Sequence, residues 1–548
     1  MKAAAPKPFL RVPSFPGARP ASFGDVARAP AVQDVSDIHA LLNDIRRSKV
    51  GGDYWGSQPA LPDPPYTLVR VAEPKPLMRD PPGESMLIWV PGSGLDLDPS
   101  VLTVAGPCDP WHLLSGASSV LVDADDELAL IAAIAGLPLT VIGEGRFSTL
   151  SSNDPHALET AARAKIAEID YADPFTGDPI TAADAVRHCA FWRRLVDGNR
   201  DLSAAFGFAF WKRPTVAPLL WGGDGPVPFA SSPSETRSGG AVATWKSRVS
   251  PDVLEQLEEQ GASLVEVEDG FIRSAGLGAN CVPPLSIVVD RIGAHFDPSG
   301  PSELENMLQN ATFAPELLGR AAELRRLIVD SGISKYESGS VPMERRIADR
   351  LHVLVPGQVE DDRAVLCGSG PVITNFELLR RAREQVPDAF ILYKPHPDVE
   401  AGHRIGGIPD DECLTLADEI VRDQPISALI DLVDEVHVNS SLAGFEALLR
   451  FKPVTTHGVP FYAGWGLTRD LGSIPARRTT KRSLDELVAA VLLLYPRYLD
   501  PVTGLPCPPE ILVRRIAEGG MRKQSGAVVQ LRRLQGRLKK RFVGLGSR

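Results

Sequence analysis

Two adjacent carboxylates, Glu268 and Asp269, follow an alternating apolar and polar run that begins at Leu264. Such alternation predicts a β-strand that delivers both acids to one end of a sheet. Adjacent carboxylates in that position, followed by Gly270 and Arg273, suit a general base or a carboxylate nucleophile. Asp-Gly is also a common turn dipeptide, so a simple turn remains an alternative for this motif taken alone.

Two nitrogen donors follow a second apolar run, Phe390–Tyr393, which also predicts a strand. Lys394 and His396 alternate with Pro395 and Pro397, whose rings restrict the backbone of this loop. Together the two side chains supply donors for a phosphate or a carboxylate group. A loop histidine by itself is usually a surface residue, so the assignment depends on the other residues at this sheet edge.

Two serines stand between a predicted strand at 436–438 and a predicted helix at 443–449. Either Ser440 or Ser441 would cap that helix through its hydroxyl group. Helix N-termini at the edges of α/β sheets bind anionic groups, because free N–H groups and the helix dipole converge there. The serines and the preceding Lys–His loop therefore predict a phosphate site.

Two further motifs have open alternatives. The segment 351–363 predicts a strand ending in Pro-Gly, and Glu360, Asp361 and Asp362 follow it. These acids would bind a ribose hydroxyl or cap a helix, and the segment is not a Gly-rich dinucleotide or ATP motif. The aromatic and glycine-rich segment 460–470 would either pack a domain joint or cover a ligand.

Length and composition restrict the class of protein. At 548 residues, with 43% hydrophobic and 23% charged residues, the chain predicts two or three globular domains. No apolar run approaches the roughly 20 residues that cross a bilayer, and we expect neither export nor a membrane span. The net charge of −11 argues against a nucleic-acid partner. The segment 514–548, with eleven Lys or Arg residues and one acid, predicts a basic helix that lies on an anionic membrane or packs on the protein.

An internal repeat organises the chain. Segment 120–143 resembles 435–458, and 171–179 resembles 498–506, in the same order. In the earlier copy, Asp125 and Asp126 stand at the positions of the two serines, and their charge would repel a phosphate; Ile131 stands at the position of Glu446. We therefore expect the N-terminal unit to be a degenerate, partial copy that packs but does not catalyse.

These blocks resemble the capsule polysaccharide biosynthesis and export proteins of the KpsC/LipB type. The resemblance covers about 206 to 500 and rests on EDGFIRSAGLG, PPLSIVVD, PGQVEDD, KPHPDV, SSLAGFEALL and PFYAGWGLT, with WKR at 211–213. It implies an α/β fold with a glycosyltransferase-B-like pair of Rossmann-type domains. It also implies a retaining β-Kdo transferase, in which CMP-Kdo donates 3-deoxy-D-manno-oct-2-ulosonic acid to a (lyso)phosphatidylglycerol or Kdo lipid linker of capsular polysaccharide.

The resemblance also implies roles for individual residues. Asp269 would be the nucleophile or base, with Glu268 as the alternate, and His396 would stabilise the leaving phosphate without a metal or cofactor. Arg273 would pair with the donor carboxylate, an inference from its charge. The nucleotide and phosphate site would comprise Lys394, His396, Pro397, Ser440, Ser441 and Glu446.

The expected organisation follows from these observations. We expect a Pro/Ala/Gly-rich, partly disordered segment at 1–80, a degenerate unit at 81–200, and the acid-bearing Rossmann-like domain at 201–350. The nucleotide-sugar domain would span 351–510 and the basic helix 511–548. The first copy lacks the other motifs of the family, so we expect one active site and one linkage type.

Two rival functions remain open. The motifs also suit another CMP-activated sugar acid, such as a sialic acid. A non-catalytic scaffold for capsule assembly or export is the second alternative, which the intact second copy disfavours. The expected partners are a nucleotide-sugar donor, an anionic glycolipid acceptor and capsule biosynthesis or export proteins. The expected location is the cytoplasm, with peripheral contact at the inner face of the inner membrane if the basic segment binds lipid.

Overall fold

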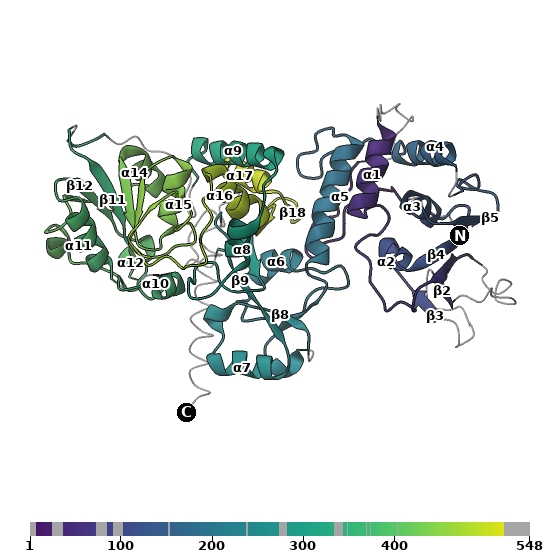
Figure 1. Cartoon of the computed structure of the whole chain (residues 1–548), viewed down its shortest axis with the longest axis horizontal. Coiled ribbons are helices and arrows are strands. Elements are labelled where there is room, and N and C mark those ends of the chain that lie inside the picture. The colour runs from purple at the N-terminus through teal and green to yellow at the C-terminus, as the bar shows by residue number, and fades with distance from the viewer. Residues whose placement is uncertain are drawn as a thin grey trace. The chain divides into compact units, whose positions relative to one another are not determined.

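The computed structural model describes residues 7–24, 37–72, 85–90, 102–151, 154–236, 239–272, 282–333, 344–347, 349–368, 370–372, 374–402 and 404–519. The chain divides into two compact units (Figure 1). The first unit comprises Met1–Asp201 and Leu220–Val227, and the second comprises Leu202–Leu219 and Pro228–Arg548. Each unit is an α/β structure, as the alternation of strand and helix patterns predicts.

The first unit is built on a parallel five-stranded sheet with the order β3-β2-β1-β4-β5. Its strands are β1 (Tyr66–Arg70), β2 (Ser85–Val90), β3 (Leu102–Ala105), β4 (Ala117–Asp123) and β5 (Leu139–Ile142). The central strand β1 lies within the segment 1–80 that the composition sets apart from this unit. Composition did not indicate this strand because β1 is only 5 residues long and the segment around it is rich in proline.

The described helices of the first unit are α1 (Ile38–Ser48), α2 (Pro110–Leu114), α3 (Leu128–Ala135), α4 (Pro155–Ile166) and α5 (Ala182–Asp197). Helix α3 packs on β4 and β5, and α1 packs against α3 and α5. Helix α1 begins at Ile38, where the Asp37 side chain caps it by accepting from the Ala40 N–H at 2.9 Å. The residues before it, 25–36, lie outside the described part of the chain.

The second unit contains two sheets. The first has the order β18-β17-β10-β9-β8-β6-β7 and is mixed, because β9, β10, β17 and β18 pair antiparallel. Its strands are β6 (Leu202–Phe206), β7 (Phe229–Ala230), β8 (Ala241–Thr244), β9 (Ser263–Asp269), β10 (Ser286–Asp290), β17 (Pro496–Leu499) and β18 (Pro506–Cys507). Strands from near the end of the described chain therefore complete a sheet that begins near residue 202.

The helices that accompany this mixed sheet are mostly short. They are α6 (Arg213–Val216), α7 (Pro251–Glu259), α8 (Glu303–Asn310), α9 (Pro315–Asp330), α16 (Leu484–Val488) and α17 (Pro509–Ala517). Three 3-10 turns (Ala217–Leu219, Pro233–Glu235 and Lys246–Arg248) and a π-helical segment at Ala489–Leu494 complete this part.

The other sheet of the second unit is entirely parallel, with the order β13-β12-β11-β14-β15-β16. Its strands are β11 (His352–Pro356), β12 (Phe390–Lys394), β13 (Glu419–Ile420), β14 (Glu435–Val438), β15 (Val454–Thr456) and β16 (Arg469–Asp470). Its helices are α10 (Arg363–Gly368), α11 (Asn375–Gln385), α12 (Pro397–Glu400), α13 (Asp410–Cys413), α14 (Ile426–Leu432) and α15 (Leu442–Leu449). The strand and the helix predicted on either side of the serine pair are β14 and α15.

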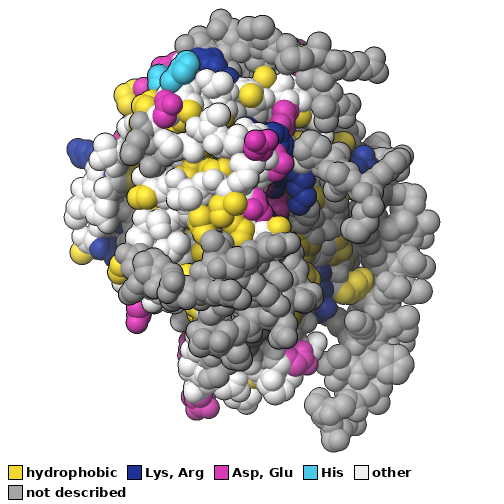
Figure 2. Space-filling view, turned by 90° about the vertical axis from the view of Figure 1, so that its right-hand side faces the viewer, with side chains coloured by type: hydrophobic (Ala, Val, Ile, Leu, Met, Phe, Trp, Pro, Cys, Tyr) yellow, Lys and Arg dark blue, Asp and Glu magenta, His cyan; other side chains and the backbone are white. Residues whose placement is uncertain are grey.

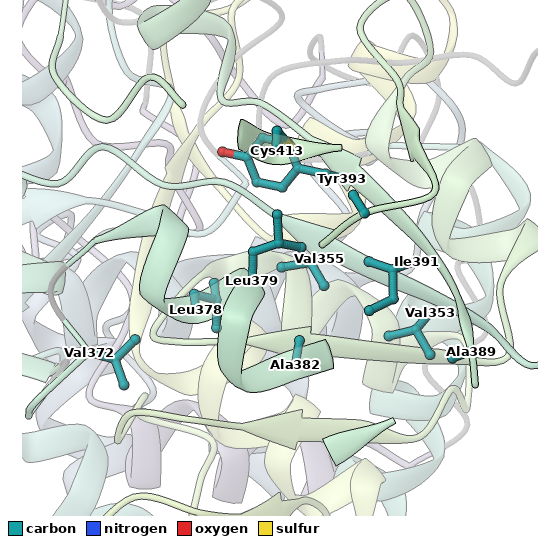
Figure 3. Packing of buried hydrophobic residues seen from close by; sticks show 11 residues of the cluster. Val353, Val355, Val372, Leu378, Leu379, Ala382, Ala389, Ile391, Tyr393 and Cys413 are labelled. Carbon is teal, nitrogen blue, oxygen red and sulfur yellow. The ribbon is translucent and has the colours of Figure 1, made fainter. Parts of the chain in front are cut away.

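Apolar packing fixes the parallel sheet in place. Buried side chains of α11 meet those of β11 and β12, and Tyr393 and Cys413 close the cluster at one end (Figure 3). The members are Val353, Val355, Val372, Leu378, Leu379, Ala382, Ala389, Ile391, Tyr393, Cys413 and Ala417. This core packs between β11 and β12, and their parallel register, with Pro356 opposite Lys394, sets the loops that follow side by side.

The sheet of the first unit and the parallel sheet of the second share a strand order. The series β3-β2-β1-β4-β5 corresponds, strand for strand, to β13-β12-β11-β14-β15. Later in each unit, Ala172 pairs antiparallel with Pro179, and Leu499 pairs antiparallel with Pro506. These pairs have the same spacing and lie in the two segments that resemble each other in sequence.

Ion pairs join several of the described charged side chains outside the candidate site. On the face shown in Figure 2, Lys and Arg side chains among the described residues lie beside Asp and Glu side chains and next to a hydrophobic group. In the first unit, for example, Arg193 lies 2.8 Å from Asp109 and Arg70 lies 2.7 Å from Asp126. No helix in the described ranges is both long and apolar enough to cross a bilayer. Residues 520–548, most of the predicted basic helix, lie outside those ranges.

Candidate active site

Strand β9 ends at the acid pair, as predicted. Glu268 lies opposite Val288 and Asp269 opposite Ile287 of the antiparallel neighbour β10. Successive side chains of a strand point to opposite faces, so Glu268 shares a face with Glu266 and Asp269 points the other way. The acids therefore belong to a paired strand end and not to a tight turn.

Gly270 is required by a close approach of two strands. Its N–H donates to the carbonyl oxygen of Ser286 at 3.0 Å. A Cβ at this position would lie 2.2 Å from Ser286 Oγ and 2.8 Å from Ser286 Cβ. This contact, and not a turn conformation, explains the glycine that follows the acids.

A buried lysine faces Asp269. Lys212 Nζ donates to Asp269 Oδ1 at 3.2 Å and lies 3.1 Å from the centre of the Trp245 ring. The Lys212 side chain is only 7% exposed. A cation in such a poorly solvated position, held by a carboxylate and an aromatic face, favours the ionised form of Asp269. The sequence offered a signal for Lys212 only through the WKR block.

Glu268 has different surroundings from its neighbour. Arg363 Nη1 donates to Glu268 Oε1 at 2.9 Å and to Glu266 Oε1 at 2.7 Å. Burial, together with the charges of Asp269 and Glu266, raises the pKa of Glu268 to about 8, against the opposing charges of Arg363 and Lys212. Glu268 therefore exchanges a proton near neutral pH, which is the property expected of a general acid or base.

The loop after β12 presents Lys394 and His396. The Lys394 side chain is buried, and its Nζ donates to the carbonyl oxygen of Arg422 at 3.2 Å. His396 is the N-cap of α12, and its Nδ1 accepts from the Asp398 N–H at 3.1 Å. Because Nδ1 is an acceptor in this contact, the neutral ring carries its proton on Nε2. Pro397 follows as the first residue of α12, where its fixed φ suits the helix.

The serine pair lies at the N-terminus of α15. Ser441 is the cap residue, and its Oγ accepts from the Ala443 N–H at 3.2 Å. Ser440 is bound on both sides by Gln358, whose Nε2 donates to Ser440 Oγ at 3.2 Å and whose Oε1 accepts from the Ser440 N–H at 3.3 Å. Gln358 belongs to the PGQVEDD block, and the sequence alone did not identify it as a site residue.

The three acids after Gln358 have structural partners. Glu360 accepts from the Asn375 N–H at 2.7 Å, and Asp362 Oδ1 accepts from the Ala364 N–H at 3.0 Å near the start of α10. Asp361 pairs with Arg404 at 3.0 Å. Of the two alternatives left by the sequence, these contacts favour helix capping and surface pairing over a ribose contact.

Helix α10 connects the acidic strand end to the serine pair. Its first residue, Arg363, binds Glu266 and Glu268, while its last residue, Gly368, lies beside Ser440. A Cβ on Gly368 would be 3.3 Å from Ser440 Cβ. The two parts of the predicted site, which come from different sheets of the second unit, therefore meet across one short helix.

The aromatic segment at 460–470 packs the joint between those sheets. The Phe461 ring centre lies 4.9 Å from that of Phe271, two residues after the acid pair. The Tyr462 hydroxyl donates to the carbonyl oxygen of Ser441 and would collide, at 2.2 Å, with a Cβ on Gly444. Trp465 is fully buried. These contacts favour the packing alternative for the described side chains of this loop.

A cavity of about 260 Å³ lies beside the Lys–His loop. Arg422, one of its lining residues, pairs with Glu400 at 2.7 Å and with Asp410 at 2.5 Å. Apolar side chains and charged groups of both signs therefore line the cavity. Its lining residues are Tyr393, Pro395, Val399, Glu400, Gly406, Gly407, Ile408, Asp410, Cys413, Ile420 and Arg422.

Two predicted site residues remain to be placed. Glu446 is buried on α15, one turn beyond the serine pair. Arg273, proposed from its charge as the partner of a donor carboxylate, lies outside the described residues.

Comparisons with known proteins find similar sequences and structures. The family model described as "Capsule polysaccharide biosynthesis protein" matches residues 240–338 and 323–498. The capsule polysaccharide modification protein LipA of Neisseria meningitidis serogroup A is 35% identical over 422 residues, which cover 73% of this chain and 60% of LipA. The lipopolysaccharide-processing protein LpsZ of Rhizobium meliloti is 46% identical over 243 residues, which cover 43% of this chain and 54% of LpsZ.

A solved structure is also similar. The β-Kdo 2,4 transferase of KpsC from Thermosulfurimonas dismutans is 33% identical, with a TM-score of 0.50. The match covers 57% of this chain and 98% of that structure. By contrast, the chain spans less than two thirds of the length of the curated relatives that it matches.

Proposed function

The chain belongs to the capsule polysaccharide biosynthesis family, and on that premise we propose that it is a retaining glycosyltransferase that uses CMP-Kdo. The observation that carries this proposal is α10, which joins the acid pair of β9 to the serine pair of α15 within one unit. The proposed architecture is a glycosyltransferase-B-like pair, in which the mixed sheet bears the acids and the parallel sheet binds the donor nucleotide.

The donor phosphate binds at the N-terminus of α15. The hydroxyl groups of Ser440 and Ser441, the Lys394 ammonium and the His396 Nε2–H supply the donors and the positive charge. The nucleoside extends from there into the cavity beside the Lys–His loop. The carboxylates of Glu400 and Asp410, which line this cavity, suit the amino group of cytosine and would repel the O4 atom of uracil.

Asp269 is the nucleophile in the proposed reaction. One carboxylate oxygen bonds to the anomeric carbon of Kdo as the bond from that carbon to the phosphate oxygen breaks, and CMP leaves with the electron pair. Lys212 favours the ionised Asp269 that this step needs. His396 stabilises the charge on the departing phosphate.

The second step restores Asp269. The acceptor hydroxyl attacks the same carbon from the side that CMP has left, and the bond to Asp269 breaks, so two inversions give net retention. Glu268 takes the proton of the hydroxyl. Its pKa of about 8 makes Glu268 a stronger base than an ordinary carboxylate.

The first unit is a degenerate duplicate of the donor-binding half. The shared strand order and the equivalent Ala172–Pro179 and Leu499–Pro506 pairs support a common origin. Asp125, at the position of Ser440, accepts from the Arg146 N–H at 3.0 Å and presents negative charge where the second unit presents hydroxyl groups. The chain accordingly adds one linkage type from one active site.

The acceptor is an anionic (lyso)phosphatidylglycerol or Kdo lipid linker. The basic segment 514–548 supports contact with the inner face of the inner membrane, where other capsule biosynthesis and export proteins would receive the product. The protein itself acts in the cytoplasm in this proposal.

Incubation of the purified chain with CMP-Kdo and a Kdo-lipid acceptor tests the proposal by mass spectrometry. We expect a gain of one Kdo mass with the wild type and its loss in Asp269→Ala and His396→Ala. Asp252→Ala and His156→Ala, at exposed helical positions, are the matched controls and should retain transfer. Transfer from CMP-sialic acid alone would reassign the donor, and no transfer from either would favour the scaffold alternative.

A further inference from the structure

We propose that Arg363 is a positioning residue that holds Glu268 in place and tunes its proton affinity, an inference that rests on the proposed transferase function. Neither the family motifs nor the sequence pattern assigns it a role. The geometry supplies the role: Arg363 comes from the parallel-sheet half of the second unit, and Glu268 from the mixed-sheet half.

The contacts of Arg363 are directional. Its Nη1 lies 2.9 Å from Glu268 Oε1 and 2.7 Å from Glu266 Oε1, and its guanidinium carbon lies 5.1 Å from the centre of the Phe296 ring. A planar guanidinium fixes the direction of a carboxylate more strictly than a lysine ammonium does. Glu268 is thereby aimed by a residue that lies 95 positions away in the chain.

The two acids that Arg363 contacts do not depend on it equally. Glu266 is also paired with Lys246, whose Nζ lies 3.0 Å from Glu266 Oε2. Loss of Arg363 would leave Glu266 with a cation at bonding distance. The larger effect would fall on Glu268, where Arg363 opposes burial and the neighbouring acids in setting the pKa.

Arg363 is attached to the donor site through its own helix. Five residues later α10 ends at Gly368, which packs beside Ser440 and accepts from the Val459 N–H at 2.7 Å. The same short helix therefore carries the Glu268 contact and forms part of the wall behind the phosphate site. This arrangement places Glu268 correctly only when the two halves of the unit are together.

The test compares pH profiles of kcat/KM for wild type, Arg363→Gln and Arg363→Lys. Glu268 acts as a base in the proposed reaction. On the acidic limb of the profile, kcat/KM therefore rises with pH as Glu268 loses its proton. Removal of the cation should raise the pKa of Glu268 and move that limb upward by about one pH unit or more. We expect kcat in Arg363→Gln to fall by about 100-fold, the loss that misplacement of a catalytic group by an ångström can cause. Arg363→Lys should shift the limb less and recover part of kcat.

Arg404→Gln is the matched control. Arg404 pairs with Asp361 in the loop that precedes α10, and none of its contacts among the described residues involves the acid pair, so its removal should leave the limb in place. A double-mutant comparison adds a second criterion. In a Glu268→Gln background, Arg363→Gln should lower kcat by no more than about a further twofold, because the effects of substituting two coupled residues are not additive. Thermal unfolding of each variant shows whether it is folded.

The outcomes separate the two proposals. The inference is wrong, and Arg363 is structural, if the wild type transfers sugar but the acidic limb of Arg363→Gln does not move. The same conclusion follows if Arg363→Gln lowers kcat by the same factor in the Glu268→Gln background as in the wild type. If the wild type transfers no CMP-activated sugar acid at all, the transferase function is wrong, and the inference falls with it before any variant is measured.

Discussion

Gln358 and Ser440 hold each other through two reciprocal hydrogen bonds, one at 3.2 Å to Ser440 Oγ and one at 3.3 Å from the Ser440 N–H. Gln358 is in turn fixed by Asn375, which accepts from the Gln358 N–H and donates to its carbonyl oxygen, both at 2.8 Å. Two loops of the parallel sheet are thus locked together at the point where we propose that the donor phosphate binds. The position of Ser440 depends on Gln358 as much as on its own helix.

Gln358→Ala should weaken donor binding because Ser440 loses both of its hydrogen bonds to the Gln358 side chain. We expect the dissociation constant for CMP, measured by titration calorimetry, to rise about tenfold, which corresponds to about 1.4 kcal/mol. Gln256→Ala, on the exposed side of α7, is the control and should bind CMP as the wild type does. Equal CMP affinity in wild type and Gln358→Ala would show that Ser440 does not contact the nucleotide phosphate.

Lys212→Met should impair chemistry more than binding. Methionine keeps much of the packing against Trp245 but removes the cation that lies 3.2 Å from Asp269 Oδ1. We expect single-turnover transfer to slow by about 100-fold or more, the scale of losing a charge that stabilises a reacting group, while the CMP affinity stays within about twofold. Parallel losses in transfer and CMP affinity would instead indicate a role in donor binding.

Gly270→Ala should destabilise the second unit. The new methyl group would lie 2.2 Å from Ser286 Oγ, so the two strands would have to separate, at a cost of about 1–3 kcal/mol. Chemical unfolding of the second-unit transition measures this loss. Gly319→Ala is the contrasting control: Gly319 lies within α9, a Cβ there meets nothing within 4 Å, and alanine should stabilise that helix by about 0.5–1 kcal/mol.

Glu268 should make the protein less stable as the pH rises. Its pKa is about 8 in the folded chain and about 4.3 in an unfolded one, so the folded state binds the extra proton between these values. The stabilising effect of that proton is complete below about pH 4 and is lost as the pH rises through 8. Replacement by glutamine, which carries no charge, should remove this loss.

Denaturation midpoints at pH 6 and pH 8.5 compare wild type with Glu268→Gln. We expect the variant to gain stability relative to the wild type at the higher pH. Glu377→Gln is the comparison of opposite sign, because Arg380 and Arg381 lower the pKa of Glu377 to about 2. Its ionised form stabilises the fold across this range, so this variant should be less stable than the wild type at both pH values. A constant difference between Glu268→Gln and wild type would contradict the raised pKa of Glu268.

The local elements around the site could be predicted from the sequence. Alternation before Glu268 indicated β9, the apolar run before Lys394 indicated β12, and the serine pair marked the start of α15. These elements depend on side-chain periodicity and helix capping, which act over a few neighbouring residues. The family also followed from the sequence, because its motifs occur together and in order.

Only the tertiary structure revealed the side chains that complete the site. Asp269 meets Lys212 from 57 positions away, Ser440 meets Gln358 from 82, and Glu268 meets Arg363 from 95. The tertiary structure also showed that Glu360 and Asp362 accept from backbone N–H groups near the starts of α11 and α10, and that β1 belongs to the first sheet. The first two contacts form within one sheet and its loops, and the third forms where the two sheets of the unit meet; the direction and burial of each charge are set by that packing. No local pattern in the chain encodes either property.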